Sequence, residues 1–296
     1  MELLKLEEDV LKRSTFFQDV QIWPINNKLN YEGWLSNFKT DEEKRIGYAL
    51  LNSFIYYSND MINELLKKCL ILSSCYIKTI IRNWDVTDIY EKAVFSYMPG
   101  EKHHITDSGL HFARILKKVF NISENRILSP SNLVESIARI SKDTPIIFVD
   151  DFVGTGTQAK EAWNDFSHNG IKLNKLLQDR ISIYCPLICN QRGYDRILKE
   201  CVGLKLICNH ILGDEYNLIK ENCISWGGDI NLFNSAKSFL FTKGKELSIY
   251  SYCSNTVDIY GYACQGLSIA FQHGTPDATS AIYTHKSENW KPLIIY

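Results

Sequence analysis

Two adjacent carboxylates and a short glycine turn are the residues of this chain best suited to chemistry. Asp150 and Asp151 follow the apolar run 145–149, and two residues later comes a turn made of Gly154, Thr155, Gly156 and Thr157. Glycine permits positive φ and close approach of the backbone, so the amide groups of this turn can point at an anion. The turn therefore predicts a phosphate site, to which the threonine hydroxyl groups add donors.

The charges near the turn narrow the choice of ligand. No Lys or Arg lies between Lys142 and Lys160, so a phosphate would be held mainly by neutral donors and the dipole of the following helix. Ionised carboxylates only accept hydrogen bonds, so Asp150 and Asp151 should face hydroxyl groups or a cation. The combination predicts a 5-phosphorylated ribose, with its phosphate on the turn and its diol on the acids.

A buried strand and an amphipathic helix must position these residues. The run 145–149 is apolar and β-branched, which is typical of a strand covered on both faces in a parallel sheet. After the turn, apolar residues recur at helical spacing, and Gly170 is expected to end that helix. The segment is therefore predicted to fold as strand, turn and helix.

Other interpretations of the turn remain open. Residues 154–159 fit the GxGxxA pattern of dinucleotide-binding proteins, but four residues, two of them acidic, separate the strand from the turn. The next predicted strand, 181–188, contains no acid, and the Walker A pattern is absent. A purely structural tight turn would explain the glycines, but it would not explain two adjacent acids at the end of a buried strand.

The surrounding sequence alternates strands with helices. Strands are expected at 92–97, 126–128, 145–149, 181–188 and 204–209, with helical segments between them. This alternation predicts an α/β fold with a parallel sheet of about five strands flanked by helices. Ligands bind such a sheet at the carboxyl ends of its strands, where the loops after 92–97 and 145–149 both lie.

The stretch 149–157 resembles the PRPP loop of type I phosphoribosyltransferases, which has a hydrophobic strand, two acids and a Thr/Gly-rich turn that opens a helix. The resemblance implies that Asp150 and Asp151 are the catalytic acids, which bind the 2′ and 3′ hydroxyl groups of ribose. It implies that the turn binds the 5′-phosphate. It also implies that Mg²⁺ enters with the pyrophosphate of PRPP, and no metal site made by side chains alone is expected.

In this family the loop after the first core strand holds pyrophosphate. Here that loop contains Lys102, His103 and His104, and Ser108 and Gly109 open the next helix. Backbone donors of the last two residues and the charge of Lys102 and His103 could bind pyrophosphate. A solvated loop with no such role is the alternative interpretation of the histidine pair.

Composition excludes several classes of protein. The net charge of the 296-residue chain is −1, which does not indicate direct binding to nucleic acid. No apolar run approaches the length of a membrane span, and the first ten residues do not resemble a signal peptide. The nine cysteines are scattered and form no CxxC pair, so reduced thiols and a cytoplasmic location are expected.

The chain is expected to have three parts. Residues 1–90 should form a helical N-terminal region, 91–212 the core, and 213–296 a hood packed on the core. Several blocks of the last part resemble the C-terminal extension of phosphoribosyltransferase-like proteins from bacterial conflict and phage-defence operons, including retron operons; these blocks are Gly261-Tyr262, Gly266-Leu267, Thr275-Pro276-Asp277 and Trp290-Lys291-Pro292-Leu293. That resemblance implies a protein partner from such an operon.

Two departures from the family pattern argue against ordinary base salvage. Gly154 stands where hypoxanthine-guanine enzymes carry an Asp, and no lysine-bearing flexible loop is evident between Phe120 and Ser129. The predicted function is Mg²⁺-assisted ribosyl transfer or hydrolysis at C1 of PRPP or a ribonucleotide, by an effector of antiviral defence. The alternative is a non-catalytic nucleotide-sensing subunit of a defence complex.

Overall fold

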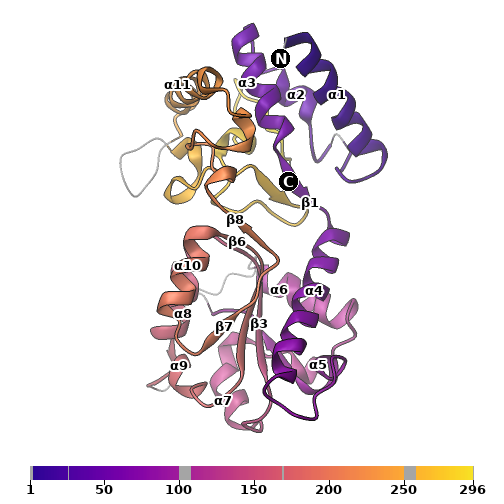
Figure 1. Ribbon diagram of the computed structural model, residues 1–296, viewed down its shortest axis with the longest axis vertical. Coiled ribbons are helices and arrows are strands. Elements are labelled where there is room, and N and C mark those ends of the chain that lie inside the picture. Colours follow the sequence, from indigo (N-terminus) through magenta and orange to yellow (C-terminus); the bar gives the residue numbers. More distant parts are fainter. Residues whose placement is uncertain (1–2, 26, 100–107, 169, 250–257, 296) are drawn as a thin grey trace. The chain divides into compact units, whose positions relative to one another are not determined.

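Figure 1 shows the computed structural model of the chain, which describes residues 3–25, 27–99, 108–168, 170–249 and 258–295. Contacts within the chain divide it into two compact units. The first unit joins Met1–Asn59 to Gly213–Tyr296, and the second unit is Asp60–Leu212. All the predicted core strands therefore fall in the second unit, which interrupts the first in sequence.

Within the described residues, the second unit contains a parallel sheet of five strands, as the sequence predicted. Its order is β2-β3-β6-β7, and β8 pairs with β6 beyond the end of β7. The strands are β2 (Val94–Ser96), β3 (Ile146–Val153), β6 (Ser182–Asn190), β7 (Leu204–Leu206) and β8 (His210–Leu212). The two longest strands, β3 and β6, lie side by side, and every residue of β6 is buried. Continuous burial on both faces explains the unbroken apolar runs in their sequences.

Helices cover both faces of this sheet, as predicted (Figure 1). They are α4 (Asn59–Lys78), α5 (Asp88–Lys92), α6 (Ser108–Lys118), α7 (Leu133–Ala138), α8 (Thr157–Asn164), α9 (Leu173–Leu176) and α10 (Gln191–Glu200). Two neighbouring residues of β6 show which helices cover each face of the sheet. Tyr184 packs in one hydrophobic cluster with Trp163 of α8 and Ile197 of α10, whereas the thiol of Cys185 lies 3.0 Å from the Ser73 hydroxyl of α4. Successive side chains of a strand point to opposite faces, so α8 and α10 cover one face and α4 covers the other.

Two predicted strands differ from the structure. Residues 126–128 form only one bridge, from Ile127 to Phe95, because a tight turn at Glu124–Arg126 uses the neighbouring amides. The predicted strand 204–209 is divided into β7 and β8. The division lies opposite the middle of β6, where Pro186 has no N–H group to donate to the ladder.

The segment around the turn also has different bounds from those predicted. β3 continues to Val153, so the two acids lie inside the strand rather than after it. Helix α8 ends at Asn164, and Gly170 lies instead between β4 (Ser167–His168) and β5 (Ile171–Lys172), which form a small antiparallel hairpin. Gly170 has a φ of 78°, which suits the tight turn of a hairpin as well as a helix end.

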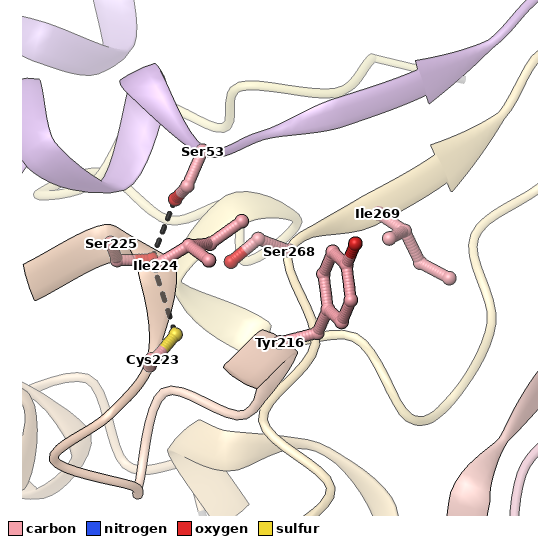
Figure 2. A pocket seen from close by; sticks show the side chains of 7 residues that line it. All are labelled: Ser53, Tyr216, Cys223, Ile224, Ser225, Ser268 and Ile269. Atoms are coloured by element: carbon pink, nitrogen blue, oxygen red, sulfur yellow. Dashed lines mark hydrogen bonds between the residues drawn. The ribbon is translucent and has the colours of Figure 1, made fainter. Parts of the chain in front are cut away.

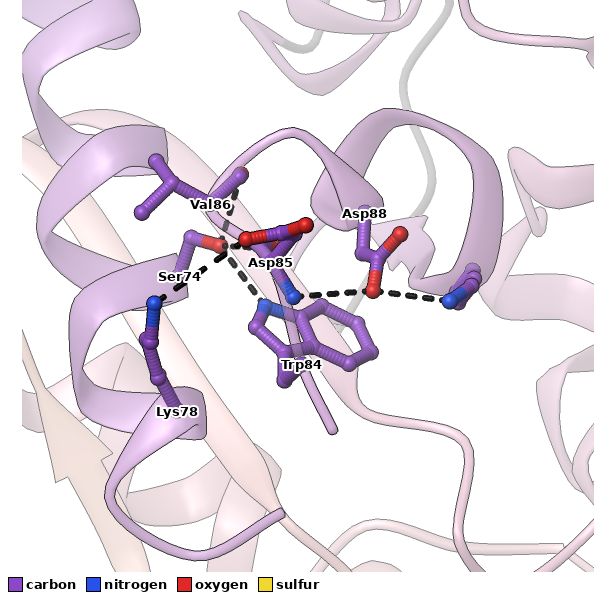
Figure 3. A network of polar contacts seen from close by, with 7 residues as sticks. Ser74, Lys78, Trp84, Asp85, Val86 and Asp88 are labelled. Atoms are coloured by element: carbon purple, nitrogen blue, oxygen red, sulfur yellow. Dashed lines mark hydrogen bonds and ion pairs between the residues drawn. The ribbon is translucent and has the colours of Figure 1, made fainter. Parts of the chain in front are cut away.

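A polar network holds the connection between α4 and α5 (Figure 3). The indole N–H of Trp84 donates to the Ser74 hydroxyl at 2.7 Å, and that hydroxyl donates to the carbonyl of Val86 at 2.7 Å. Asp88 accepts from the amide of Asp85 at 2.9 Å and from Lys92 at 2.7 Å. Trp84 is buried, so Ser74 satisfies a donor and an acceptor that water does not reach freely.

The first unit has a core built from both ends of the chain. Its elements are α1 (Leu3–Asp19), α2 (Tyr31–Leu35), α3 (Asp41–Asn52), β1 (Ile55–Tyr57), α11 (Ile230–Glu246) and β9 (Ile269–Phe271). β1 and β9 pair in parallel, and one hydrophobic cluster contains Trp23, Trp34, Trp226 and Trp290. A capping box of Thr40 and Glu43 begins α3.

This division differs from the predicted boundary at residue 90. Helix α4 belongs almost entirely to the sheet unit, because its Ser73 and Cys69 face β6, and residues 1–59 share a core with the C-terminal region. The expectation that 213–296 cover the ligand pocket stays a prediction. Among the described helices, none combines the length and apolarity needed to cross a bilayer.

Candidate functional site

The acid pair and the glycine turn meet at the carboxyl end of β3. Asp150 and Asp151 occupy the fifth and sixth positions of this strand, the turn follows Val153, and α8 begins at Thr157. The predicted order of strand, turn and helix is thus present in the structure. Since β2 and β6 run parallel to β3, the residues that follow all three strands lie at the same edge of the sheet.

The carboxyl group of Asp150 accepts a hydrogen bond from a tyrosine hydroxyl and another from a backbone amide. Tyr184 on β6 donates its hydroxyl to Asp150 Oδ2 at 2.8 Å, and the amide of Asp151 donates to Oδ1 at 2.9 Å. Asp151 in turn accepts from the amide of Phe152 at 2.8 Å. Burial and the neighbouring charge of Asp151 raise the pKa of Asp150 well above its usual value, although the Tyr184 bond opposes this change. Two acids in this setting favour a ligand that brings hydrogen-bond donors or positive charge.

The turn presents donors at the start of α8. Gly156 has a φ of 73° and occupies the N-cap position, where it has no side chain to cap the helix. The amide of Thr157 donates to Thr155 Oγ1 at 3.4 Å. The hydroxyl groups of Thr155 and Thr157 lie 3.0 Å apart. The first amides of a helix have no partner within the helix, so they and the two hydroxyl groups can bind an anion here.

Helix α10 packs directly against the turn, a contact that was not predicted from the sequence. A Cβ atom on Gly193 would lie 2.3 Å from the carbonyl oxygen of Gly154, and one on Gly156 would lie 2.8 Å from the carbonyl oxygen of Gly193. Glycine at these positions lets the two backbones touch. The N-cap side chain of Asn190 fixes the start of α10 by accepting from the amide of Arg192 at 3.0 Å.

Arg196 of α10 brings a positive charge to the turn. Its Nη1 donates to Thr157 Oγ1 at 2.7 Å, and its Nε lies 3.8 Å from Glu200, which also pairs with Lys160 of α8 at 3.1 Å. Arg196 therefore adds a charged donor to the mainly neutral donors that the sequence predicts around the turn. The sequence does contain a signal for this contact. Arg196 follows Gly193 by three residues, so both lie on one face of a helix that must start at the same edge of the sheet as the turn.

The second predicted loop is described only in part. Lys102 and His103 lie outside the described residues, as does His104. Ser108 begins α6, and a Cβ atom on Gly109 would lie 2.2 Å from the Tyr97 ring, so this glycine allows Tyr97 to pack against the helix. The predicted pyrophosphate site at Ser108 and Gly109 stays a prediction.

A pocket in the first unit offers a different chemistry (Figure 2). Its lining includes the Ser225 hydroxyl, which lies 2.6 Å from that of Ser53 and 3.5 Å from the sulfur of Cys223. Burial raises the pKa of the Cys223 thiol, so the thiol stays protonated near neutral pH and is a poor nucleophile. These groups satisfy one another, which supports a structural role.

Metal ligands do not cluster in the described part of the chain, where no group of three or more His, Cys, Asp or Glu residues is placed to hold an ion. The eight cysteines that the structure describes are free thiols.

The model of one known protein family matches most of the chain, including this site. The family model PRTase-CE matches residues 31–295, which include the acid pair, the turn, α10 and nearly all of the C-terminal region. No match was found among curated proteins or among solved structures.

Proposed function

We propose that the end of β3 binds a 5-phosphorylated ribose, because the chain belongs to the PRTase-CE family of phosphoribosyltransferases with a C-terminal extension. The family match agrees with the resemblance found in the sequence. The proposal is carried by one observation: two carboxyl groups are followed, at the end of a buried parallel strand, by a glycine turn that opens a helix. Such an arrangement would offer acceptors for sugar hydroxyl groups next to donors for a phosphate.

The electrostatics of the acid pair support a diol as its ligand. Burial and mutual repulsion make ionisation of Asp150 costly in the free protein. The 2′ and 3′ hydroxyl groups of a ribose would each donate a hydrogen bond, and such bonds favour the ionised form. Each carboxylate oxygen can accept more than one bond, so the contacts from Tyr184 and the backbone amides leave capacity for the sugar.

The chemistry that fits this site is substitution at C1 of the ribose. The bond from C1 to pyrophosphate or to a base breaks with its electron pair on the leaving group, and an acceptor or water forms the new bond and releases its proton to solvent. The sugar becomes positively charged as the old bond breaks, so the negative charges of Asp150 and Asp151 would stabilise the transition state. Mg²⁺ bound to the pyrophosphate oxygens would offset the charge of that leaving group.

The biological role we propose is that of an effector in bacterial antiviral defence, acting on nucleotide pools together with a protein encoded in the same operon. The support is the resemblance of the C-terminal blocks to extensions found in such operons. Plaque counts on cells that express the operon with unaltered protein or with Asp150→Asn/Asp151→Asn test this role. Equal plaque numbers for the two forms would exclude a defence role for the ribose site.

A non-catalytic nucleotide sensor is the second candidate. The observation that favours it is Gly154, which offers no side chain to act as a base toward a nucleobase. A sensor would bind ribose phosphates as tightly as an enzyme but would release them unchanged. Incubation with PRPP, NAD and nucleotides, followed by mass spectrometry, separates the two functions.

Binding to ribose 5-phosphate, measured by calorimetry, tests the site itself. We expect the unaltered protein to bind and the variant Asp150→Asn/Asp151→Asn to lose binding while it stays folded. Asp143→Asn is the matched control, because Asp143 is exposed just before β3. Equal binding by all three proteins would exclude the acids from the site, and crystals soaked with the ligand should show its phosphate at the amides of Gly156 and Thr157.

A further inference from the structure

We propose that Arg196 gives the phosphate turn its positive charge and makes it selective for a terminal phosphate monoester. The inference rests on the proposed ribose-phosphate site and names the class of ligand that it takes. Arg196 comes from α10, and its guanidinium reaches the first residue of α8, with Nη1 2.7 Å from Thr157 Oγ1. The contact is short and charge-assisted, which fixes both partners.

The contact decides which way the Thr157 hydroxyl can act. Because Thr157 Oγ1 accepts from Arg196, its own hydrogen must point elsewhere, either to the Thr155 hydroxyl 3.0 Å away or to a ligand. Arg196 thus converts Thr157 into a donor toward the turn. A guanidinium has five N–H donors, so others remain for the oxygens of a phosphate, and the side chain is 30 % exposed.

The packing of α10 fixes the position of Arg196 relative to the turn. Gly193 touches the backbone of Gly154 and Gly156, and Arg196 follows it by one turn of the same helix. Any shift of α10 away from the turn would break the backbone contact and the Arg196 bond together. The charge is therefore built into the fold rather than carried on a mobile surface loop.

The balance of charge favours a doubly charged group. Arg196 and Lys160 share the single carboxylate of Glu200, so these three side chains together carry a net charge of +1. A terminal phosphate monoester carries close to two negative charges near neutral pH and offers three acceptor oxygens. An internal phosphate carries one charge and two free oxygens. Ribose 5-phosphate, PRPP and nucleoside 5′-monophosphates should therefore bind in preference to NAD, whose phosphates are internal.

Calorimetry with ribose 5-phosphate, ribose and NAD tests the inference on the full chain. We expect Arg196→Gln to weaken ribose 5-phosphate binding by about tenfold or more, the loss typical of one charge-assisted hydrogen bond. Its affinity should also become less sensitive to added salt, since one charge contact is gone. Lys199→Gln is the control, because it removes one positive charge from an exposed position of the same helix and should change affinity less than about twofold. Arg196→Lys should recover part of the affinity.

The outcomes separate this inference from the proposed function. If the unaltered protein binds ribose 5-phosphate and Arg196→Gln binds within about twofold of Lys199→Gln, the role of Arg196 is overturned while the ribose site stands. If NAD binds as tightly as ribose 5-phosphate, the selectivity is overturned. If the unaltered protein binds no ribose phosphate, the proposed site fails and this inference falls with it. Should Arg196→Gln not fold, Arg196→Met keeps the length of the side chain and is judged by the same criteria.

Discussion

Asp150 lies where an ionised carboxylate is costly. Although part of its surface is exposed, burial and the charge of Asp151 raise its pKa well above the usual value, and the bond from Tyr184 compensates only in part. A carboxyl group whose pKa is raised by folding stabilises the folded state while it is protonated. That contribution is present below the unfolded pKa and is lost as the pH rises through the folded pKa.

Asp150→Asn should remove this dependence on pH. The amide is neutral at every pH, and its oxygen can still accept a hydrogen bond from the Tyr184 hydroxyl. The melting temperature of the variant should therefore increase relative to that of the unaltered protein as the pH rises above about 4. Thermal melting between about pH 4 and about pH 8 measures the gain. Asp143→Asn should show no such trend, and a constant difference for Asp150→Asn across the range would contradict the assigned environment.

At the scale of elements, the contact of α10 with the turn joins stability to binding. Gly193→Ala would place a methyl group 2.3 Å from the carbonyl oxygen of Gly154, so either α10 or the turn must move. Overpacking of this kind costs about 1–3 kcal/mol, and the movement would also displace Arg196 from Thr157. We expect a lower melting temperature and weaker binding of ribose 5-phosphate. Gly274→Ala is the control, since no described atom lies within 4 Å of the position of its added Cβ. Normal binding by Gly193→Ala would show that the turn tolerates a shift of α10.

The connection between α4 and α5 depends on one hydroxyl group. Ser74→Ala would leave the buried indole N–H of Trp84 and the carbonyl of Val86 without their partner, which costs about 1–3 kcal/mol. Melting temperature measures this loss, and ribose-phosphate binding should not change. Ser123→Ala, at an exposed position of the same unit, should be neutral. A neutral Ser74→Ala would mean that water replaces the hydroxyl and that the network of Figure 3 adds no stability.

At the scale of the whole molecule, the two ends of the chain depend on each other. The amide of Asn30 donates to the carbonyl of Leu293 at 2.8 Å, and the Trp34 indole donates to the carbonyl of Ile282 at 2.8 Å. The ring of Trp290 packs edge-on against Phe38 with centroids 5.6 Å apart. The first unit therefore lacks a complete core until the last residues of the chain are present.

Truncation after Gly274 should unfold the first unit. It removes Trp290 and Leu293 from the shared core, and loss of a buried Trp alone costs about 3–5 kcal/mol, against a typical total stability of about 5–15 kcal/mol. Solubility and thermal melting of the truncated chain measure the effect, with Trp290→Ala as the milder form and Glu288→Ala, at an exposed position, as the control. A soluble truncated chain that melts and binds ribose 5-phosphate like the full chain would show that this region is neither core nor hood.

The sequence by itself determined the local elements of the site. The apolar run before Asp150, the glycine turn and the helical spacing after it each depend on residues close together in the chain, so strand, turn and helix could be predicted in order. The helix end was not predicted correctly, because Gly170 suits a hairpin turn as well as a helix terminus. The capping box at Thr40 was predictable for the same local reason.

Only the tertiary structure decided which distant groups meet at that turn. Tyr184 reaches Asp150 from 34 residues away in sequence, and Arg196 reaches Thr157 from 39 residues away. These contacts depend on the pairing of β3 with β6 and on how α10 packs, which follow from the sum of many weak interactions rather than from any local pattern. The same reason applies to the first unit. Burial of the aromatic residues at both ends of the chain could be predicted, but the sequence does not show that they pack against one another.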